Sequence, residues 1–425
     1  MSAPLVCVVN LGCRVNRVES DRISCDLARA GVELVDEASA DIVVINTCAV
    51  TAEAESKTRK AVRRALSGER EPMVVVTGCV VNLHADELTD LSARVVAEPM
   101  KADVCARVLE IAHSTGSDTL ECEFDMGELL GRSRIGVKIQ DGCNNRCTYC
   151  IVWKARGPER SVPVETILAQ VNEAVRAGFN EVVLTGVNLG AYDGERSGDS
   201  HVEIDELVQI IMENTDLAQL RLSSIEPMDV SERLLKVMAR YRDRIAPFLH
   251  IPLQSGCTST LRRMARPYSA ERFMQIVQSA RCILPDIALS CDVIVGFPGE
   301  TEEEFEESYR LCERVGFSRM HVFRYSKRPG TPAAAAADQI GPHIMAARSS
   351  RLRELAHRMA LADAAKRLGT QERAVIENGS AATLESFHRV LVEGGEDLCS
   401  GELVSVRLKS LDESGVLHGS VVRAR

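Results

Sequence analysis

Short apolar runs alternate with amphipathic stretches along the first quarter of the chain. The runs LVCVVNLGC, DIVVINTC and MVVVTGC are rich in Val and Ile, and each reaches a cysteine after a Gly or an Asn-Thr pair. Apolar residues at helical spacing follow at 17–30, 52–67 and 101–113. Strands that alternate with helices predict a mainly parallel sheet with helices on its faces.

A second alternation begins at Arg134, after a polar stretch at 115–133 that is expected to be a linker. Its strand candidates are RIGVKIQ, EVVLTGV, QLRLSSI, FLHIPLQ, LSCDVIVGF and RMHVFRY. Helical patterns between them include 164–177, 231–241, 270–284 and 301–315. Six strands in such a series predict a partial (βα)6 barrel, with its active site at the C-terminal strand ends.

The pattern changes after a long helix expected at 345–368. AVIENGSA, HRVLVE, LVSVRLKSLD and VLHGSVVRAR are short strands with Gly-containing turns and no helix between them, which predicts a small β-barrel. The alanine run at 333–337 is expected to be a loop or a helix start. The chain is therefore expected to be an α/β protein of three domains, at 1–114, 134–365 and 366–425.

The composition of the chain indicates the compartment in which the protein works, and the compartment in turn indicates the chemical state of its cysteines. The chain has 425 residues, of which 45% are apolar and 26% charged, and no apolar run reaches the ~20 residues of a membrane span. The start MSAPLVCVVN lacks the regions of a signal peptide, so a cytoplasmic protein is expected. In a reducing compartment the 15 cysteines are expected to be thiols, metal ligands or nucleophiles instead of disulfides.

The net charge of −10 argues mildly against a nucleic-acid partner, but it is only an average. Residues 300–307 form an acidic block, whereas basic residues gather in one short span at Lys57, Arg59, Lys60, Arg63 and Arg64. A local basic face of this kind could bind phosphate.

Three cysteines crowd into one loop, in the sequence Cys143-Asn-Asn-Arg-Cys147-Thr-Tyr-Cys150. A structural zinc site is the alternative, but it needs four ligands, and no fourth Cys or His lies close by in the sequence. An iron–sulfur cubane needs one ligand per iron, so three thiolates leave one iron open to a substrate.

A second set of three cysteines is spread along the chain. Cys13, Cys48 and Cys79 each end a predicted strand of the first sheet, and the C-terminal ends of parallel strands share one edge. The three thiolates could therefore converge and hold a second cluster with an open iron. The alternative is three unrelated buried cysteines, which is the state expected for Cys7, Cys25, Cys105, Cys122, Cys282, Cys291 and Cys312.

The CxxxCxxC loop, just past the first strand of a βα series, resembles that of the radical S-adenosylmethionine (SAM) superfamily. The resemblance implies that the open iron chelates the methionine part of SAM and that an electron then releases a 5′-deoxyadenosyl radical. Tyr149 matches the aromatic residue near the adenine, with a plain core aromatic as the alternative.

Strand ends that follow the loop in order match the other SAM contacts of that superfamily. The resemblance implies contacts to the methionine ammonium after the second strand, to the ribose after the third, and to the adenine after the fifth, where glycine allows close approach. Taken singly, each of these could be an ordinary turn. The residues are Thr185, Gly186, Asn188, Ser224, Glu226, Gln254, Val295 and Gly296.

The whole arrangement resembles the methylthiotransferase family, which joins a three-cysteine domain, a radical SAM domain and a TRAM domain. The resemblance implies two [4Fe-4S] clusters, SAM as source of both radical and methyl group, an electron donor such as flavodoxin or ferredoxin, and a sulfur donor. The words LGCRVNRVES, NTCAVTAEAESKTRK and LTGVNLGAYDG look most like the branch that modifies C2 of N6-threonylcarbamoyladenosine next to the tRNA anticodon. Other branches act on isopentenyladenosine in tRNA or on an aspartate of a ribosomal protein. The chain departs from the family at Val80-Val81-Asn82 and at Trp153-Lys154, which are expected near the substrate entrance.

An RNA substrate also agrees with the chemistry of the basic positions. Bases of an anticodon loop can be splayed into a pocket, stacked on aromatic rings such as Trp153 and held by phosphate contacts. Candidate contacts flank the cysteine loop and lie on the expected terminal barrel, and a basic run from Arg348 to Arg373 either extends this surface or is a solvated helix face. They are Arg146, Lys154, Arg156, Arg160, Arg389 and Arg407. An iron–sulfur RNA-binding or sensor protein without turnover is the alternative from another class.

Overall fold

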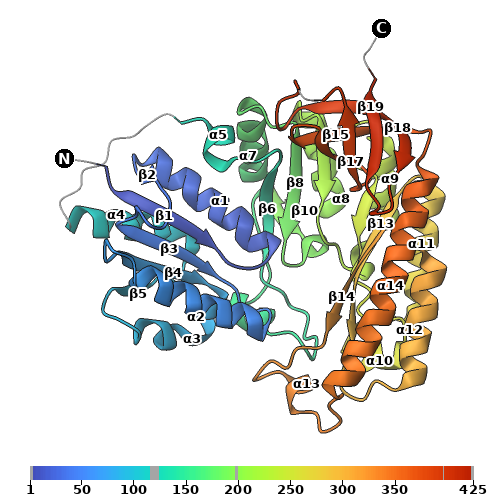
Figure 1. Cartoon of the computed structure of the whole chain (residues 1–425), viewed down its shortest axis with the longest axis horizontal. Coiled ribbons are helices and arrows are strands. Elements are labelled where there is room, and N and C mark those ends of the chain that lie inside the picture. The colour runs from blue at the N-terminus through green and yellow to red at the C-terminus, as the bar shows by residue number, and fades with distance from the viewer. Residues whose placement is uncertain (1–2, 115–123, 197–199, 396, 423–425) are drawn as a thin grey trace.

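The computed structural model describes residues 3–114, 124–196, 200–395 and 397–422. Three units follow one another along the chain, and we call them the N-terminal unit, the central barrel and the terminal barrel (Figure 1). The fold class expected from the sequence is confirmed in all three.

The N-terminal unit is a five-stranded parallel sheet in the order β2-β1-β3-β4-β5. Alternate residues of the fully buried central strand β3 face two separate cores, one under α2 and α3 and the other under α1 and α4. This explains why the strand reads as a continuous apolar run. The strands are β1 (Leu5–Asn10), β2 (Glu33–Leu34), β3 (Ile42–Thr47), β4 (Met73–Gly78) and β5 (Val95–Ala97), and the helices are α1 (Arg14–Arg29), α2 (Ala52–Leu66), α3 (Cys79–Thr89) and α4 (Val104–Ser114).

The central barrel is open on one side. Its strands pair in parallel as β6-β8-β11 and β12-β13-β14, and isolated bridges such as Ser224 to His250 join β11 to β12. The predicted partial barrel of six strands is thus confirmed. The six strands are β6 (Ile135–Asp141), β8 (Glu181–Gly186), β11 (Gln219–Leu222), β12 (Phe248–His250), β13 (Ala288–Val295) and β14 (Arg319–Arg324), with the short strands β7 (Arg160–Ser161), β9 (Asp193–Arg196) and β10 (Ser200–Glu203) beside them.

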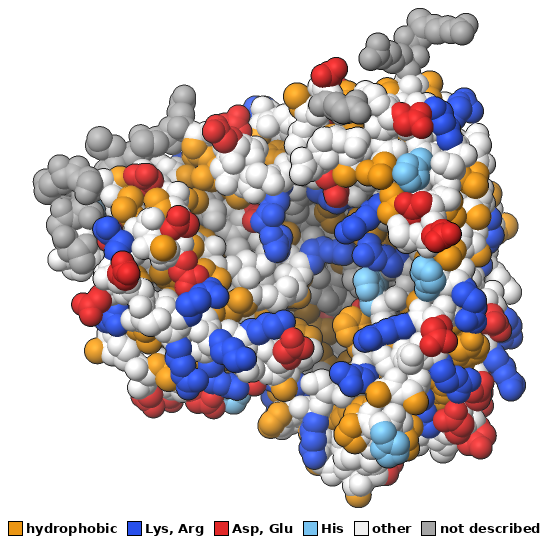
Figure 2. Space-filling view, viewed as in Figure 1, with side chains coloured by type: hydrophobic (Ala, Val, Ile, Leu, Met, Phe, Trp, Pro, Cys, Tyr) orange, Lys and Arg blue, Asp and Glu red, His pale blue; other side chains and the backbone are white. Residues whose placement is uncertain are grey.

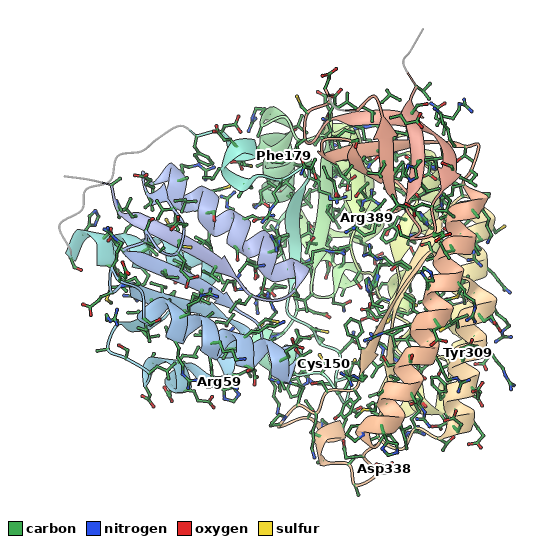
Figure 3. All side chains as sticks on the ribbon, in the orientation of Figure 1. Arg59, Cys150, Phe179, Tyr309, Asp338 and Arg389 are labelled. Carbon is green, nitrogen blue, oxygen red and sulfur yellow. The ribbon has the colours of Figure 1, made fainter. Side chains whose placement is uncertain are left out.

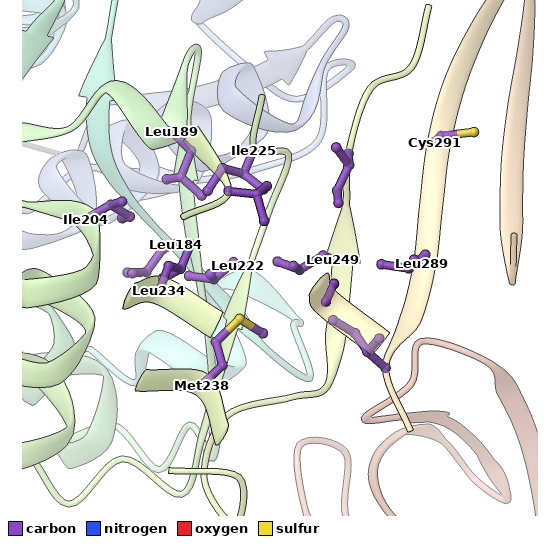
Figure 4. Close-up of a cluster of buried hydrophobic side chains, with 14 of the residues drawn as sticks. Leu184, Leu189, Ile204, Leu222, Ile225, Leu234, Met238, Leu249, Leu289 and Cys291 are labelled. Atoms are coloured by element: carbon purple, nitrogen blue, oxygen red, sulfur yellow. The ribbon is translucent and has the colours of Figure 1, made fainter. Parts of the chain in front are cut away.

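Helices cover the outside of the barrel, and apolar side chains fill the layer between them and the strands (Figure 4). Leu184, Leu222 and Leu249, on three successive barrel strands, lie in this layer with Leu234 and Met238 of α9. The helices of this part are α5 (Met126–Leu130), α6 (Val152–Arg156), α7 (Val164–Arg176), α8 (Ile204–Asn214), α9 (Glu232–Arg240), α10 (Thr258–Arg263), α11 (Ala270–Ile283), α12 (Glu302–Val315), α13 (Pro332–Ala335) and α14 (Pro342–Lys366).

Two details differ from the sequence-based expectation. Within the expected linker, residues 126–130 form helix α5, whose first turn is capped by the Asp125 side chain; the first part of that stretch lies outside the described residues. The helix α3 begins at Cys79 itself without a side-chain cap, and this is why its start was not predicted.

The terminal barrel is closed, in the order β15-β16-β17-β19-β18, and it covers the N-terminal ends of the central strands. Arg221 of β11 is 1% exposed and donates to the carbonyl oxygens of Glu385 and Leu384 at 2.8 and 3.2 Å. The strands are β15 (Gln371–Asn378), β16 (Ala381–Leu384), β17 (Arg389–Glu393), β18 (Leu403–Leu411) and β19 (Leu417–Val421).

The surface is hollowed between the N-terminal unit, β14 and the terminal barrel, and Lys and Arg side chains gather around this hollow (Figure 2). Among the described helices, none combines the length and apolar character that a membrane crossing requires.

Candidate active site

The three cysteines of the loop lie directly beyond the C-terminal end of β6. Cys147 is buried and Cys143 and Cys150 are half-buried, and the loop is pinned to the barrel by a bond from the Thr148 hydroxyl to the Arg263 carbonyl oxygen at 2.8 Å. Burial raises the pKa of the Cys143 thiol to about 11 and that of Cys150 to about 12, and the charge of the neighbouring Cys147 adds to both shifts. The three sulfur atoms are therefore close enough to interact, and a cation bound among them would stabilise their thiolates.

A buried arginine lies against this loop. Arg266 donates from Nη1 to the Sγ of Cys147 at 3.1 Å and forms an ion pair with Glu226. Glu226, the carboxylate expected to face the ribose, is thus held at the third strand end beside the cysteines. Sequence patterns gave no indication of Arg266, since it lies in the turn after α10 and far along the chain.

The second strand end is ordered by polar contacts around Asn188. Its backbone N–H donates to Gln140 at 2.8 Å and its side chain to Glu159 at 2.9 Å, while its Oδ1 is buried without a hydrogen-bond partner among the described residues. A free acceptor of this kind fits a ligand ammonium. Thr185, by contrast, is 1% exposed and donates to the Val183 carbonyl oxygen at 3.3 Å.

The fourth and fifth strand ends are shaped by unusual backbone. Gln254 has a φ of +63°, which is rare for a residue with a side chain and is typical of functional sites. Gly296 has a φ of +72°, and an added Cβ would lie 2.1 Å from Cγ of Met345. Tyr149 meets Phe297 edge to face at 6.5 Å, so the loop tyrosine packs against the fifth strand end, next to Val295.

The second set of cysteines also gathers, at the C-terminal edge of the N-terminal sheet. Cys13 caps α1, Cys48 follows β3 and Cys79 begins α3. A hydrogen bond with Cys48 lowers the pKa of the Cys13 thiol to about 6. The same bond raises the pKa of Cys48, and burial and the charge of Cys79 raise it further. Gly12 has a φ of +115° and touches Cys48 so closely that an added Cβ would lie 2.2 Å from the Cβ of Cys48.

Two fully buried polar residues tie these three strand ends together. Asn16 donates to the carbonyl oxygens of Thr47 and Leu11 at 2.7 and 3.0 Å. The Thr47 hydroxyl donates to the Thr77 carbonyl oxygen at 2.7 Å and accepts from the Val80 N–H at 3.0 Å. Each cysteine is thus positioned by backbone that this network fixes.

Arg156 connects the two sets of cysteines. It donates to Asn16 at 2.6 Å, to Glu19 at 2.8 and 3.0 Å, and to Asp141 at the end of β6 at 2.9 Å. The prediction that Arg156 contacts phosphate is wrong, because the side chain is 8% exposed at this junction and its donors are taken.

Other basic residues near the loop have mixed partners. The Trp153 ring is half-exposed and lies beneath two cations, Arg146 at 4.3 Å and Lys154 at 5.1 Å, so it is not a core residue. Lys154 also donates to the Gly330 carbonyl oxygen at 2.7 Å, and Arg160 lies 3.6 Å from Asp141.

The basic run that begins at Arg348 is mixed: Arg353, Arg358 and Lys366 are exposed on α14, as on a solvated helix face, whereas Arg348 and Arg367 hold elements together. Arg348 is 5% exposed and binds Glu300 at 2.7 Å, and Arg367 binds Glu372 at 2.9 Å. The expected surface there is therefore wrong at these two positions. The expectation of burial is wrong for Cys282, which is exposed, and Cys7 and Cys105 are half-buried; Cys122 lies outside the described residues.

The departures at 80–82 and 153–154 have separate locations. Val80 and Val81 are buried in the core under α3, so they do not line a substrate entrance, whereas Asn82 donates to the Ala155 carbonyl oxygen at 2.8 Å. Asn82 is thus a second contact, besides Arg156, between the N-terminal unit and α6 after the cysteine loop.

The donor set fits an iron–sulfur cluster better than a single ion. Within the described parts of the chain, no three His, Cys, Asp or Glu side chains are spaced to hold one metal ion. In each set the thiols nevertheless interact electrostatically, and thiolates are the ligands of iron–sulfur clusters. Cys150 lies at the foot of the hollow in Figure 3.

Comparison with known proteins agrees with this geometry. Residues 137–312 match the Radical SAM superfamily, and residues 5–97 match a family described as Uncharacterized protein family UPF0004. The radical SAM methyltransferase TsrM from Kitasatospora setae superposes with a TM-score of 0.56 at 15% identity, over 78% of this chain and 77% of that one. Fold and cysteine loop thus define a radical SAM protein, a class that implies a [4Fe-4S] cluster and SAM.

Full-length relatives narrow the class. The threonylcarbamoyladenosine tRNA methylthiotransferase MtaB of Chlamydia pneumoniae is 37% identical, over 98% of this chain and 97% of its own. The MtaB protein of Bacillus subtilis is 35% identical, over 94% of this chain and 92% of its own. The tRNA-2-methylthio-N(6)-dimethylallyladenosine synthase of Zymomonas mobilis is 32% identical, over 96% of this chain and 95% of its own. The chain belongs to the methylthiotransferase family of radical SAM enzymes.

Proposed function

We propose that the protein adds a methylthio group to C2 of N6-threonylcarbamoyladenosine next to the anticodon of tRNA. The observation that carries the proposal is the connection between the two cysteine sets, which Arg156 makes by its bonds to Asn16, close to Cys13, and to Asp141, just before the cysteine loop. In this proposal residues 1–114 carry the sulfur site, 134–365 the radical site, and 366–425 a TRAM-like RNA-binding barrel.

The loop cysteines Cys143, Cys147 and Cys150 would hold one [4Fe-4S] cluster, and Cys13, Cys48 and Cys79 the other. When bound, the first cluster with SAM supplies an adenosyl radical and the second supplies sulfur. The protein's own residues would orient SAM and exclude water. Asn188 offers a buried acceptor to the ammonium of SAM, and Arg266 holds Glu226 in place for the ribose. Tyr149 and Phe297 form an apolar side of the site. Strand-end backbone at Thr185, Gly186, Ser224, Gln254, Val295 and Gly296 completes the proposed SAM site.

Basic side chains near the hollow support a tRNA partner. On α2, Arg59, Lys60 and Arg63 have no hydrogen-bond or ion-pair partner in the described structure, and Arg59 lies on the side of the N-terminal unit near Cys150 in Figure 3. Such residues could bind phosphates of the anticodon stem by charge alone. An electron donor such as flavodoxin or ferredoxin and a sulfur donor would complete a cytoplasmic reaction.

Mass spectrometry of tRNA nucleosides tests the proposal. A deletion strain should accumulate N6-threonylcarbamoyladenosine and lack its 2-methylthio derivative, and the wild-type gene should restore it. An unchanged level of that nucleoside, with loss of the 2-methylthio form of isopentenyladenosine or of a modified ribosomal aspartate, would instead assign one of the other substrates. Chelation of iron from the purified protein should abolish both SAM cleavage and product.

A further inference from the structure

The hollow contains arginines that lack acidic partners. Arg14 begins α1, Arg319 begins β14 and Arg389 begins β17, so each of the three units contributes one. All three are exposed, and none has a hydrogen bond or an ion pair within the described ranges. Figure 3 shows Arg389 on the edge of the terminal barrel that faces the hollow, and a cavity of about 420 Å³ opens beside Arg14.

Arg14 lies in a concentration of positive charge. Burial lowers its pKa, and so do the charges of Arg134, Arg221 and Arg319, while Asp292 opposes them. Arg134 and Arg221 are neutralised by Glu377 and Glu181. Arg14 therefore carries an exposed positive charge beside the cavity, which Asp292 offsets only in part.

Arg319 points to the same space from β14. Residues 319, 321 and 323 of this strand are exposed and 320 and 322 are buried, so Arg319 and His321 share the face toward the hollow. Burial lowers the pKa of Arg319, and Arg389 adds to this. The acidic groups nearby are Asp292, which lies 3.4 Å from His250, and Asp21 and Glu377 of the cavity wall, which pair with Arg132 and Arg134, so Asp292 offsets the arginines only in part.

An aromatic residue holds this arrangement. Phe387 of the terminal barrel has a φ of +69° and lies 5.5 Å from the guanidinium of Arg319, 5.0 Å from that of Arg221 and 5.7 Å from that of Arg134. The ring keeps neighbouring guanidiniums in place without neutralising them. Like charges held together in one hollow attract an anion.

We propose that Arg14 and Arg319 bind the carboxylate of the threonylcarbamoyl group on the substrate adenosine. This inference rests on the proposed function and deepens it. The cavity beside Arg14, the residue that directly follows Cys13, can admit a small charged group on an inserted base, whereas a backbone phosphate stays outside it. The isopentenyl group has no charge and would leave both arginines unpaired, so the same pair selects between the two tRNA substrates.

Synthetic anticodon stem-loops test this directly. One carries N6-threonylcarbamoyladenosine and the other its threonine methyl ester, and their Kd values for the cluster-loaded full chain are measured by fluorescence anisotropy alongside KM for methylthiolation. The wild-type protein should bind the acid on the order of 10- to 100-fold more tightly than the ester. Arg319→Gln and Arg14→Gln should weaken binding of the acid to the level of the ester and leave the ester unchanged.

Arg310→Gln is the matched control, because it removes the same charge from the outer face of α12 and should change neither Kd. Arg319→Lys should restore part of the preference. Equal binding of acid and ester by the wild-type protein would overturn the inference even if a variant failed to fold. Equal weakening of both RNAs by Arg319→Gln would overturn it in favour of a backbone phosphate. Methylthiolation of an isopentenyladenosine stem-loop but of neither threonyl form would instead refute the proposed function, and the carboxylate site with it.

Discussion

The two cysteine sets reach similar arrangements by opposite routes. Cys143, Cys147 and Cys150 share one loop, whose spacing alone brings their thiols together. Cys13, Cys48 and Cys79 are far apart in the sequence and meet only because three parallel strands end at one edge. The first set depends on local chain geometry, and the second depends on the whole N-terminal sheet and on the network around Asn16 and Thr47.

This difference has a chemical counterpart. In the loop set Cys147 is buried against Arg266 and the other two cysteines are half-buried, whereas the sheet set buries Cys48 and Cys79 and leaves Cys13 exposed. A site that must receive sulfur and deliver it needs access, and a site that confines a radical needs enclosure. Variants that damage one set and spare the other can therefore separate the two roles.

The largest contrast should come from removing one cysteine of each set. Cys147→Ala should reduce formation of 5′-deoxyadenosine by on the order of 1,000-fold or more, because the cluster that cleaves SAM loses a ligand. Cys48→Ala should retain SAM cleavage but form no methylthio product, and each variant should lose about one cluster of iron. Chromatography of both products in one assay measures this, and equal loss of cleavage in the two variants would contradict the division of roles.

Breaking the connection between the sets should cost stability first. Arg156→Met removes the buried partner that Glu19 and Asp141 share and leaves them with Lys101, Lys138 and Arg160, so we expect a loss of about 2–3 kcal/mol in the free energy of unfolding. Arg22→Met is the control, because Arg22 also joins the N-terminal unit to the barrel, through Glu173 at 3.5 Å, but is exposed and should cost ~0–1 kcal/mol. Denaturant titration of the apoprotein measures both losses. Similar losses in the two variants would show that the ion pairs of Arg156 contribute no more than those on the surface.

A backbone variant should damage the sheet set alone. Gly12→Ala adds a Cβ that collides with Cys48 and forces a left-handed φ on alanine, so about 2–3 kcal/mol and one cluster of iron should be lost. Gly131→Ala meets nothing within 4 Å at a φ of +56°, so it should cost only ~1 kcal/mol and no iron. Iron analysis with thermal melting distinguishes them, and full iron content in Gly12→Ala would mean that the edge is more compliant than its contacts indicate.

The smallest effect should be a dependence of stability on acid. Burial would raise the pKa of Glu19, but Arg156, Lys101 and Lys138 outweigh it and hold the pKa below the usual 4.5. A depressed carboxyl pKa contributes stability that is present above pH 4.5 and is lost as the pH falls further. Denaturation midpoints from pH 7 to pH 3 should fall more steeply for the wild-type protein than for Glu19→Gln, and parallel curves would exclude this contribution.

Much of the fold is predictable because its patterns are local. Apolar runs ended by Gly or by Asn-Thr mark β1, β3, β4 and most barrel strands, and Gly-containing turns mark the terminal barrel. The cysteine sets are also readable, one from spacing and the other from its repeated place at strand ends. Their roles as cluster ligands, like the SAM contacts, stay predictions.

The misplaced residues share a physical reason. Arg156 and Arg348 look like surface cations in the sequence, but their partners Glu19 and Glu300 lie far away along the chain and become neighbours only in the folded protein. The same holds for Arg14 and Arg319, whose proximity across two units no spacing reveals. Pairings across units decide whether a cation is structural or free to bind.

Arg221 has a consequence for how the protein can be dissected. With Glu181 it forms an ion pair that is sealed from water by the carbonyl oxygens of Glu385 and Leu384. A truncation before residue 366 would expose this pair to water and uncover the N-terminal ends of the central strands. It would also remove the ring of Phe387, which contacts Arg221 and the neighbouring arginines. The last sixty residues therefore support the central barrel, and only point substitutions on their surface can test the proposed RNA binding separately from stability.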